Sequence, residues 1–150
     1  MDLILWRHAE AAPGEPDLDR PLTPKGRRQA ARVGAWLDRR LPKSCRILVS
    51  PAIRTQQTVA ALDRKFKTND RLAPDVPPQN ILEAAGWPDA RNPVLIVGHQ
   101  PTLGQAAALL LAGDQSPWWM QKGAVWWLSN RERSRGPSVV LRAVIGADFV

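Results

Sequence analysis

Three short apolar runs along the chain predict buried β-strands. They cover Leu3–Trp6, Ile47–Val49 and Pro93–Val97. Unbroken apolar runs of this length are typical of strands that are covered on both faces, as in a parallel sheet. Polar residues follow each run directly, so the chain changes character where each strand is expected to end.

Apolar residues at three- and four-residue spacing predict helices between these strands. The clearest helix runs from Pro24 to Arg40. Thr23 is a favourable N-cap in front of it, and Pro42 stops it. Further helices are expected over residues 51–66 and 81–86 and after Pro101, whereas residues 69–78 are expected to form a short edge strand or a loop.

The end of the chain changes to β-branched and apolar residues, which predicts two or three late strands. These strands are expected over residues 118–120, 124–128 and 138–145. Strands that alternate with helices indicate an α/β fold in three layers, a mostly parallel central sheet flanked by helices, with one antiparallel edge strand. A length of 150 residues favours one domain over residues 1–150.

The charge and the cysteine content narrow the class of protein. With 21 Lys and Arg against 14 Asp and Glu, the net charge of +7 favours anionic partners. Cys45 is the only cysteine and the chain has two histidines, which excludes an internal disulfide and a zinc site of the Cys/His type. No apolar segment approaches the roughly 18 residues of a membrane span. We therefore expect a cytoplasmic protein that uses no metal and binds no membrane.

Polar residues at the carboxyl ends of the three predicted strands are candidates for a common site. Arg7 and His8 follow the first strand. Arg54 lies in the first helical turn after the second strand, and His99 follows the third. In an open α/β sheet these strand ends meet at one edge, where ligands bind. Both histidines of the chain are therefore expected at the same edge, among arginines.

Arginine and histidine at one sheet edge indicate an anionic ligand. A guanidinium matches phosphate or carboxylate oxygens with a planar pair of donors, and helix N-termini at Pro51 and Pro101 add backbone N–H groups. Repulsion from two guanidiniums favours a neutral imidazole, whose lone pair is free to attack an electrophile. For a phosphorylated ligand, that electrophile is phosphorus.

Each of these residues also has an ordinary structural explanation. A polar cap on a strand explains Arg7 and His8, and a solvated helix position or a hydrogen-bonded turn explains Arg54 or His99 alone. Only their joint placement favours a site. We interpret the tryptophans as core and sheet-face residues. The cationic face of the first helix is interpreted as a solvated surface; it carries Lys25, Arg28, Arg32 and Arg39.

Four segments in a fixed order resemble the motifs of the histidine phosphatase superfamily, which includes the cofactor-dependent phosphoglycerate mutases. Arg7-His8-Ala9-Glu10 is similar to the Arg-His-Gly signature, with Ala9 in place of the glycine. The other three segments are RPLTPKG at 20–26, which resembles the helix-opening segment, SPAIRTQQT at 50–58, which resembles the second-arginine motif, and GHQP at 98–101, which resembles the second-histidine motif. The small size, Ala9 and the short middle segment look most like the SixA-type phosphohistidine phosphatases.

The resemblance implies a two-step phosphoryl transfer that needs no cofactor. In this reaction His8 is the nucleophile that takes up the phosphoryl group, and water then releases it as phosphate. Arg7, Arg54 and His99 form the phosphate pocket, and Arg20 is similar to an additional pocket arginine of the family. The expected substrate is phosphohistidine in a partner protein.

The general acid of the larger relatives has no clear counterpart, and Asp75 and Glu83 are the two candidates for it. A phosphohistidine expels an imidazole whose conjugate acid has a pKa of about 6.5, so this leaving group needs little help near neutral pH. A missing acid therefore favours phosphohistidine over sugar phosphates. The alternative is a small-molecule phosphomonoesterase with the same mechanism, in which Asp75 or Glu83 protonates the leaving oxygen.

A non-catalytic module that binds phosphate or nucleic acid is the alternative from another class. Its support is the charge of +7 and the seven tryptophans. The sequence lacks the interleaved aromatic and basic residues of a surface that binds nucleic acid strands. Nucleic acid is therefore the less favoured partner.

Overall fold

The apolar runs of the sequence form a parallel sheet at the centre of the molecule. In the computed structural model, which describes residues 1–133 and 136–150, β4 (Val94–Gly98) lies between β1 (Asp2–Arg7) and β2 (Arg46–Val49). β4 pairs in parallel with both neighbours. Nearly every residue of these three strands is buried, as their unbroken apolar sequence predicted.

Three further strands extend the sheet, and their order over the described residues is β3-β2-β4-β1-β5-β6. The short β3 (Lys67–Thr68) continues the parallel part, whereas β5 (Val125–Arg133) pairs antiparallel with β1. β6 (Gly136–Ile145) then pairs antiparallel with β5 and forms the outer edge. The predicted α/β fold with a mostly parallel sheet is confirmed. The expected antiparallel strand is β5, which lies one position in from the edge because β6 pairs along its outer side.

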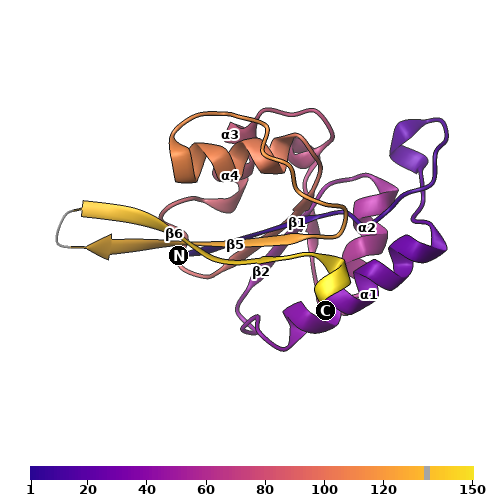
Figure 1. Cartoon of the computed structure of the whole chain (residues 1–150), viewed down its shortest axis with the longest axis horizontal. Helices are drawn as coiled ribbons and strands as arrows, with labels where there is room; N and C mark the ends of the chain where they lie inside the picture. Colours follow the sequence, from indigo (N-terminus) through magenta and orange to yellow (C-terminus); the bar gives the residue numbers. More distant parts are fainter. Residues whose placement is uncertain (134–135) are drawn as a thin grey trace.

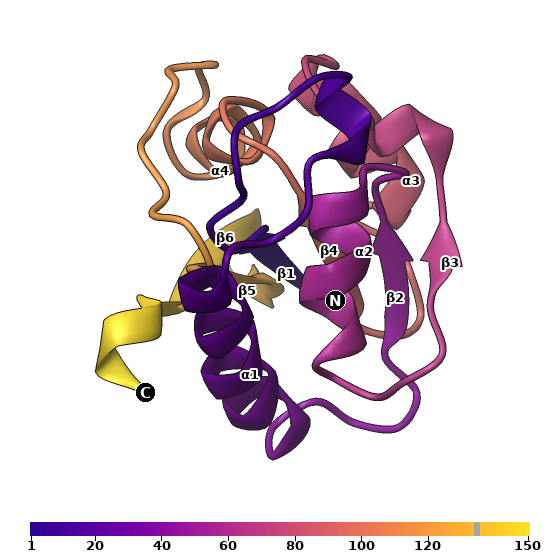
Figure 2. The ribbon, with the colours of Figure 1, turned by 90° about the vertical axis from the view of Figure 1, so that its right-hand side faces the viewer.

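Helices cover both faces of the sheet (Figure 1), and Figure 2 shows the same two layers from the side. The helices are α1 (Pro24–Asp38) and α2 (Ile53–Ala60) on one face, and α3 (Pro78–Ala85) and α4 (Thr102–Ala112) on the other. Alternate residues of each strand point to opposite faces. Trp6 accordingly packs in the core under α1 and α2, and Leu5 in the core under α3 and α4.

The sequence predicted the start of α1 but missed the end of α2 and the start of α3, which begins at Pro78 and not at Ile81. α1 begins after Thr23, whose hydroxyl accepts the Gly26 N–H at 2.9 Å, as the N-cap prediction required. The predicted continuation of the second helix to Phe66 is wrong, because α2 ends at Ala60 and the backbone reaches a positive φ of 49° at Asp63. Leu62 still packs into the core beyond the helix end, so the apolar spacing continued through the turn.

The regions around the smaller elements differ from the predictions in detail. Residues 69–78 contain a 3-10 turn at Asp70–Leu72, and the short edge strand β3 lies just before them. Residues 118–120 form no strand. A further 3-10 turn, Ala147–Phe149, packs beside α1 near the end of the chain (Figure 1). None of the described helices is long and apolar enough to cross a membrane.

Residues 118–120 are held against α4 by a small set of polar contacts. The Gln100 side chain donates to the Trp118 carbonyl and accepts from the Gly104 N–H, both at 2.8 Å. A Cβ atom added at Gly104 would lie 1.8 Å from the same Trp118 carbonyl oxygen. Only glycine therefore allows the segment to approach the helix this closely.

We predict that Gly104→Ala destabilises the protein. An alanine inside a helix normally stabilises it by about 0.5–1 kcal/mol relative to glycine, but here the added methyl group forces the backbone apart at a cost of about 1–3 kcal/mol. Urea unfolding measures the difference, with Gln105→Ala on the same helix as the control. An unchanged or raised free energy of unfolding for Gly104→Ala would contradict the close approach.

Candidate active site

The register of the parallel strands brings the two histidines together. β1 and β4 align Arg7 with Gly98, and the His8 N–H donates to the Gly98 carbonyl at 3.1 Å. His8 and His99 therefore leave adjacent strands at the same level, and their ring centroids lie 5.3 Å apart. The two imidazoles thus share one sheet edge, as the sequence indicated.

A cavity of about 290 Å³ opens at this edge. It collects most of the residues singled out from the sequence, together with several that were not. Its lining consists of Arg7, His8, Ala11, Asp17, Arg20, Arg54, Pro74, Asp75, His99, Gln100 and Lys122. The structure does not bring Glu83 to this cavity, because its carboxylate pairs with Arg71 on the surface. Over the described residues, no group of three or more His, Cys, Asp or Glu is placed to hold a metal ion.

His8 is held as a neutral imidazole with a defined tautomer. Its Nδ1 lies 2.7 Å from the Ala9 carbonyl oxygen, which can only accept a hydrogen bond. Nδ1 therefore carries the ring hydrogen, and the lone pair is on Nε2. Burial and the charges of Arg54 and Arg7 lower the pKa of His8 to about 4. The ring is thus uncharged at neutral pH and keeps a free lone pair on Nε2.

His99 lines the cavity and has one buried ring nitrogen without a partner among the described residues. Its Nε2 lies 2.7 Å from the Ser50 hydroxyl, which accepts the Ala52 N–H and can give its own proton to the ring. His99 Nδ1 then carries the ring hydrogen, and it has no hydrogen-bond partner among the described residues. Burial and the neighbouring His8 lower the pKa of His99 to about 3. A neutral ring with an unused N–H suits an anionic oxygen.

Two buried arginines complete the polar wall, and each is fixed by a backbone carbonyl. Arg7 donates from NH1 to the Met120 carbonyl at 2.7 Å, and Arg54 donates from NH1 to the Asp17 carbonyl at 2.9 Å. The Nε atom of each guanidinium has no partner among the described residues. The side chains are thus held in position while part of each donor set stays available.

Comparison with known proteins identifies the family to which this chain is related. The chain matches the model of the histidine phosphatase superfamily (branch 1) over residues 3–76. It is 39% identical over 110 residues to an uncharacterised protein of Mycobacterium tuberculosis, with 71% of this chain and 69% of that protein covered. It is 30% identical over 133 residues to the phosphohistidine phosphatase SixA homolog of Haemophilus influenzae, with 78% and 80% covered.

The solved structure of SixA from Nakamurella multipartitia superimposes with a TM-score of 0.75 at 30% identity, over 96% of this chain and 94% of that one. The chain belongs to the histidine phosphatase superfamily. Within it, the chain is similar to SixA-type proteins in sequence and in fold. It is therefore a phosphatase, which argues against the non-catalytic binding module.

The phosphatase carries an internal counter-ion at the mouth of its cavity. The Asp17 carboxylate pairs with Arg20 at 3.0 Å and with Arg54 at 3.1 Å. Hydrogen bonds from these two arginines lower the pKa of Asp17, so the group is ionised near neutral pH. About half of the Asp17 side chain is exposed, which leaves it free to move away from an incoming anion.

Alanine replaces the glycine of the signature motif without strain. Asp63 and Asp75 are the only non-glycine residues with positive φ among the described residues, so Ala9 keeps an ordinary backbone conformation. Its N–H donates to the Thr58 hydroxyl at 3.0 Å, and its methyl group packs with Leu22 and Ala30. Alanine at this position is therefore compatible with the backbone that follows His8.

Several residues that line or support the cavity had no clear signal in the sequence. Ser50, by contrast, follows the second strand directly, at a strand end where the sequence already predicted the site. Asp17 begins a 3-10 turn, Asp17–Asp19, and Lys122 lies in a turn before β5; neither follows a strand of the parallel sheet. Met120 contributes through its backbone carbonyl, which no side-chain pattern reveals.

We predict that both histidines of the phosphatase stay neutral well below pH 6.5. Their pKa values of about 4 and about 3 lie below the value near 6.5 of an unfolded chain. Below about pH 6.5 the unfolded chain therefore binds more protons than the folded protein. As the pH is lowered from there toward the folded-state pKa values, the free energy of unfolding falls by on the order of 1 kcal/mol per pH unit for each histidine.

The ring resonances in NMR spectra measure this directly, because the chain has two histidines and His8→Gln assigns them. Recording between about pH 7 and pH 5 stays above the range in which carboxylates titrate. A midpoint near 6.5 for either ring would contradict the burial of the pair.

Proposed function

We propose that the protein is a phosphohistidine phosphatase that acts on a phosphorylated protein partner through a covalent intermediate on His8. The observation that carries the proposal is the fixed tautomer of His8. Its Nδ1 hydrogen is held by the Ala9 carbonyl, so the free lone pair of Nε2 lies in a cavity lined by arginines. Similarity to a relative named as a phosphohistidine phosphatase supports the same substrate class.

The proposed reaction has two steps. His8 Nε2 attacks phosphorus, a new N–P bond forms, and the N–P bond of the substrate breaks as its imidazole leaves with the electron pair and takes up a proton. Water then attacks phosphorus on His8, loses a proton, and expels the neutral imidazole, which releases inorganic phosphate. His8 thereby returns to its starting state.

Stabilisation of charge on the phosphoryl oxygens is the main catalytic contribution in such a transfer. In the proposed roles, Arg7, Arg54 and Arg20 hold these oxygens through their guanidinium donors. His99 adds the hydrogen on Nδ1, which has no other partner among the described residues. Because the cations are fixed by contacts with the protein, little reorganisation is needed when the transition state forms.

A small phosphomonoester is the second candidate substrate, and one observation favours it. Asp75 lines the cavity, so its carboxyl group can reach a leaving oxygen there. An alkoxide leaving group needs such an acid, whereas an imidazole with a pKa of about 6.5 does not. Asp75 therefore distinguishes the two substrate classes, and Glu83 serves as a natural control because it pairs with Arg71 instead.

We predict that His8→Ala abolishes phosphate release from phosphohistidine. Loss of the nucleophile removes the covalent route and lowers kcat by about a thousandfold or more. In the unchanged protein, rapid quenching after incubation with labelled substrate should trap an acid-labile phosphoryl group, which the variant lacks. Turnover retained in a folded His8→Ala protein would defeat the proposal.

We predict that Asp75→Asn leaves phosphohistidine hydrolysis within about twofold of the unchanged protein, because an imidazole leaves without help. Any hydrolysis of sugar phosphates or nucleotides should fall by about a hundredfold, as expected when a general acid is lost. Glu83→Gln should affect neither substrate class. Equal loss on both substrates in Asp75→Asn, or a loss in Glu83→Gln, would contradict the assignment.

A further inference from the structure

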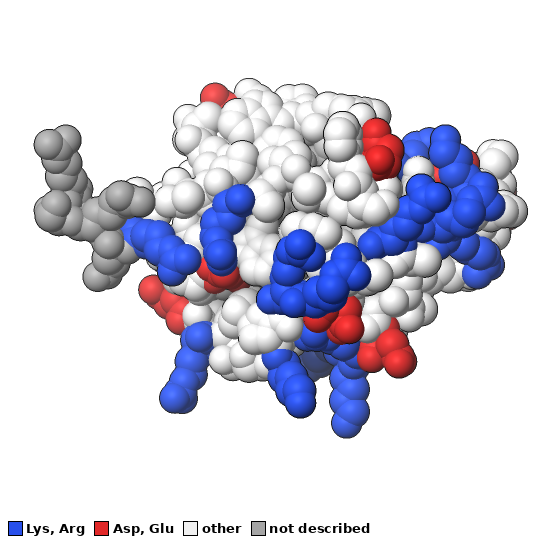
Figure 3. Space-filling model, turned by 60° about the horizontal axis from the view of Figure 1, so that its bottom comes forward, with Lys and Arg blue, Asp and Glu red and all other residues white. Residues whose placement is uncertain are grey.

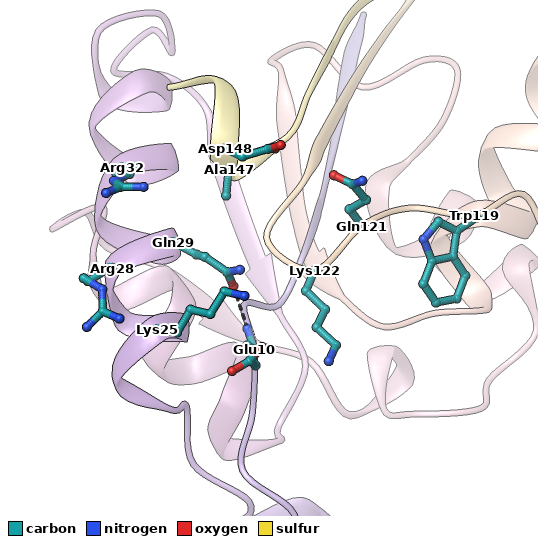
Figure 4. Close-up of a pocket in the computed structure, with 10 residues that line it drawn as sticks. All are labelled: Glu10, Lys25, Arg28, Gln29, Arg32, Trp119, Gln121, Lys122, Ala147 and Asp148. Carbon is teal, nitrogen blue, oxygen red and sulfur yellow. Dashed lines mark hydrogen bonds between the residues drawn. The ribbon is translucent and has the colours of Figure 1, made fainter.

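A groove adjoins the proposed phosphate site and runs along α1. Its volume is about 400 Å³, and Lys122 lines both this groove and the cavity that contains His8. Figure 4 shows α1 as one wall, with Lys25 reaching toward the opposite side, and Trp119 and Lys122 on the segment that forms the other wall. A substrate with its phosphoryl group at His8 can therefore extend into the groove.

The wall formed by α1 carries cations without partners. Lys25, Arg28 and Arg32 are exposed and follow each other at helical spacing on one stripe. Among the described residues, none of the three lies within 4.0 Å of a carboxylate, whereas several arginines elsewhere are paired. On the face of the molecule that includes α1, Lys and Arg outnumber Asp and Glu (Figure 3). Unpaired like charges along a groove favour an anionic occupant.

The opposite wall offers an apolar contact and hydrogen-bonding groups. The Trp119 side chain is 70% exposed, and the Arg7 guanidinium lies 5.1 Å from the centre of its ring. The Gln121 side chain also lines the groove on this side, and an amide can donate to and accept from a peptide backbone. A ligand in the groove therefore meets three cations on α1, and an aromatic ring, an amide and Lys122 on the other side.

The mixture of charges favours a polypeptide over a nucleic acid. Glu10 and Asp148 also line the groove, and they repel a nucleic acid strand, which carries a negative charge on every nucleotide. A polypeptide places its acidic residues at separate positions and leaves neutral residues opposite the two carboxylates. Strand-binding surfaces stack successive bases on several aromatic rings, whereas Trp119 is the one aromatic residue in this lining.

We propose that this groove binds an acidic segment next to the phosphorylated residue of the partner protein. From Lys25 to Arg32 the helix rises by about 10 Å, the length of about three residues of extended chain. The cationic face of α1 then has a binding role, in place of the solvated surface that its sequence suggested. The inference rests on the proposed function for the identity of the phosphorylated residue.

Two triple variants test the groove at equal net charge. Lys25→Glu with Arg28→Glu and Arg32→Glu reverses the wall of α1. The control combines Lys43→Glu, Lys65→Glu and Arg91→Glu, which are exposed and line neither the groove nor the cavity. All three positions are exposed, and glutamate at position 25, in the first turn of α1, is favourable to the helix dipole, so the first variant is expected to fold.

The substrates are short peptides that carry phosphohistidine with flanking Glu or flanking Gln, and free phosphohistidine. We expect the unchanged protein to hydrolyse the Glu peptide with a kcat/KM about tenfold above that of the Gln peptide, a preference that added salt weakens. The α1 variant should lose the preference and the control should keep it. All three proteins should hydrolyse free phosphohistidine within about twofold of each other.

Equal hydrolysis of both peptides by the unchanged protein would overturn the inference, as would an equal loss of preference in the control. A single-stranded oligonucleotide that displaces a labelled, unphosphorylated Glu peptide at lower concentration than the peptide itself would assign the groove to nucleic acid instead. The labelled peptide is followed by fluorescence anisotropy, which requires no turnover. Peptide binding without hydrolysis of any phosphohistidine substrate would defeat the proposed function and leave the groove assignment standing.

Discussion

The parallel pairing of β1 with β4 is the constraint on which the site depends. It aligns Arg7 with Gly98, so the residues that follow, His8 and His99, emerge at the same level of the sheet. Both strands are buried on their two faces, and a slip by one residue would turn every side chain to the opposite face. Core packing thus sets the separation of the two imidazoles, although neither imidazole belongs to the apolar core.

Burial gives both histidines the same charge state and different hydrogen-bonding roles. Removal from water, together with nearby positive charge, lowers both pKa values far below neutrality. The Ala9 carbonyl fixes the hydrogen on Nδ1 of His8, and the Ser50 hydroxyl occupies Nε2 of His99. His8 therefore keeps a free lone pair, and His99 keeps a free N–H when Ser50 donates to its Nε2. The proposed reaction uses the first group as nucleophile and the second as a donor to a phosphoryl oxygen.

The segment after α4 connects the cavity with the groove. Its Met120 carbonyl anchors Arg7, its Trp119 ring lies against the same guanidinium, and Lys122 borders both spaces. Gly104 lets this segment lie close to α4, and the Gln100 side chain links the two. The packing of the segment on α4 thus contributes to the position of Arg7 in the cavity. The proposed binding of the partner protein uses the same segment as the proposed binding of phosphate.

The sequence by itself determined the parallel core strands, the start of α1 and the α/β class. It also placed Arg7, His8, Arg54 and His99 at one edge of the sheet, because each of them lies at or just after the end of a parallel strand. These features follow from local patterns: unbroken apolar runs, a capping residue, and polar residues directly after strands. Only the tertiary structure decided that α2 stops at Ala60, that Asp17 and Lys122 line the cavity and that Glu83 lies outside it. Those outcomes depend on strand order and on how irregular segments pack over the sheet, and such contacts between residues distant in the chain have no local pattern.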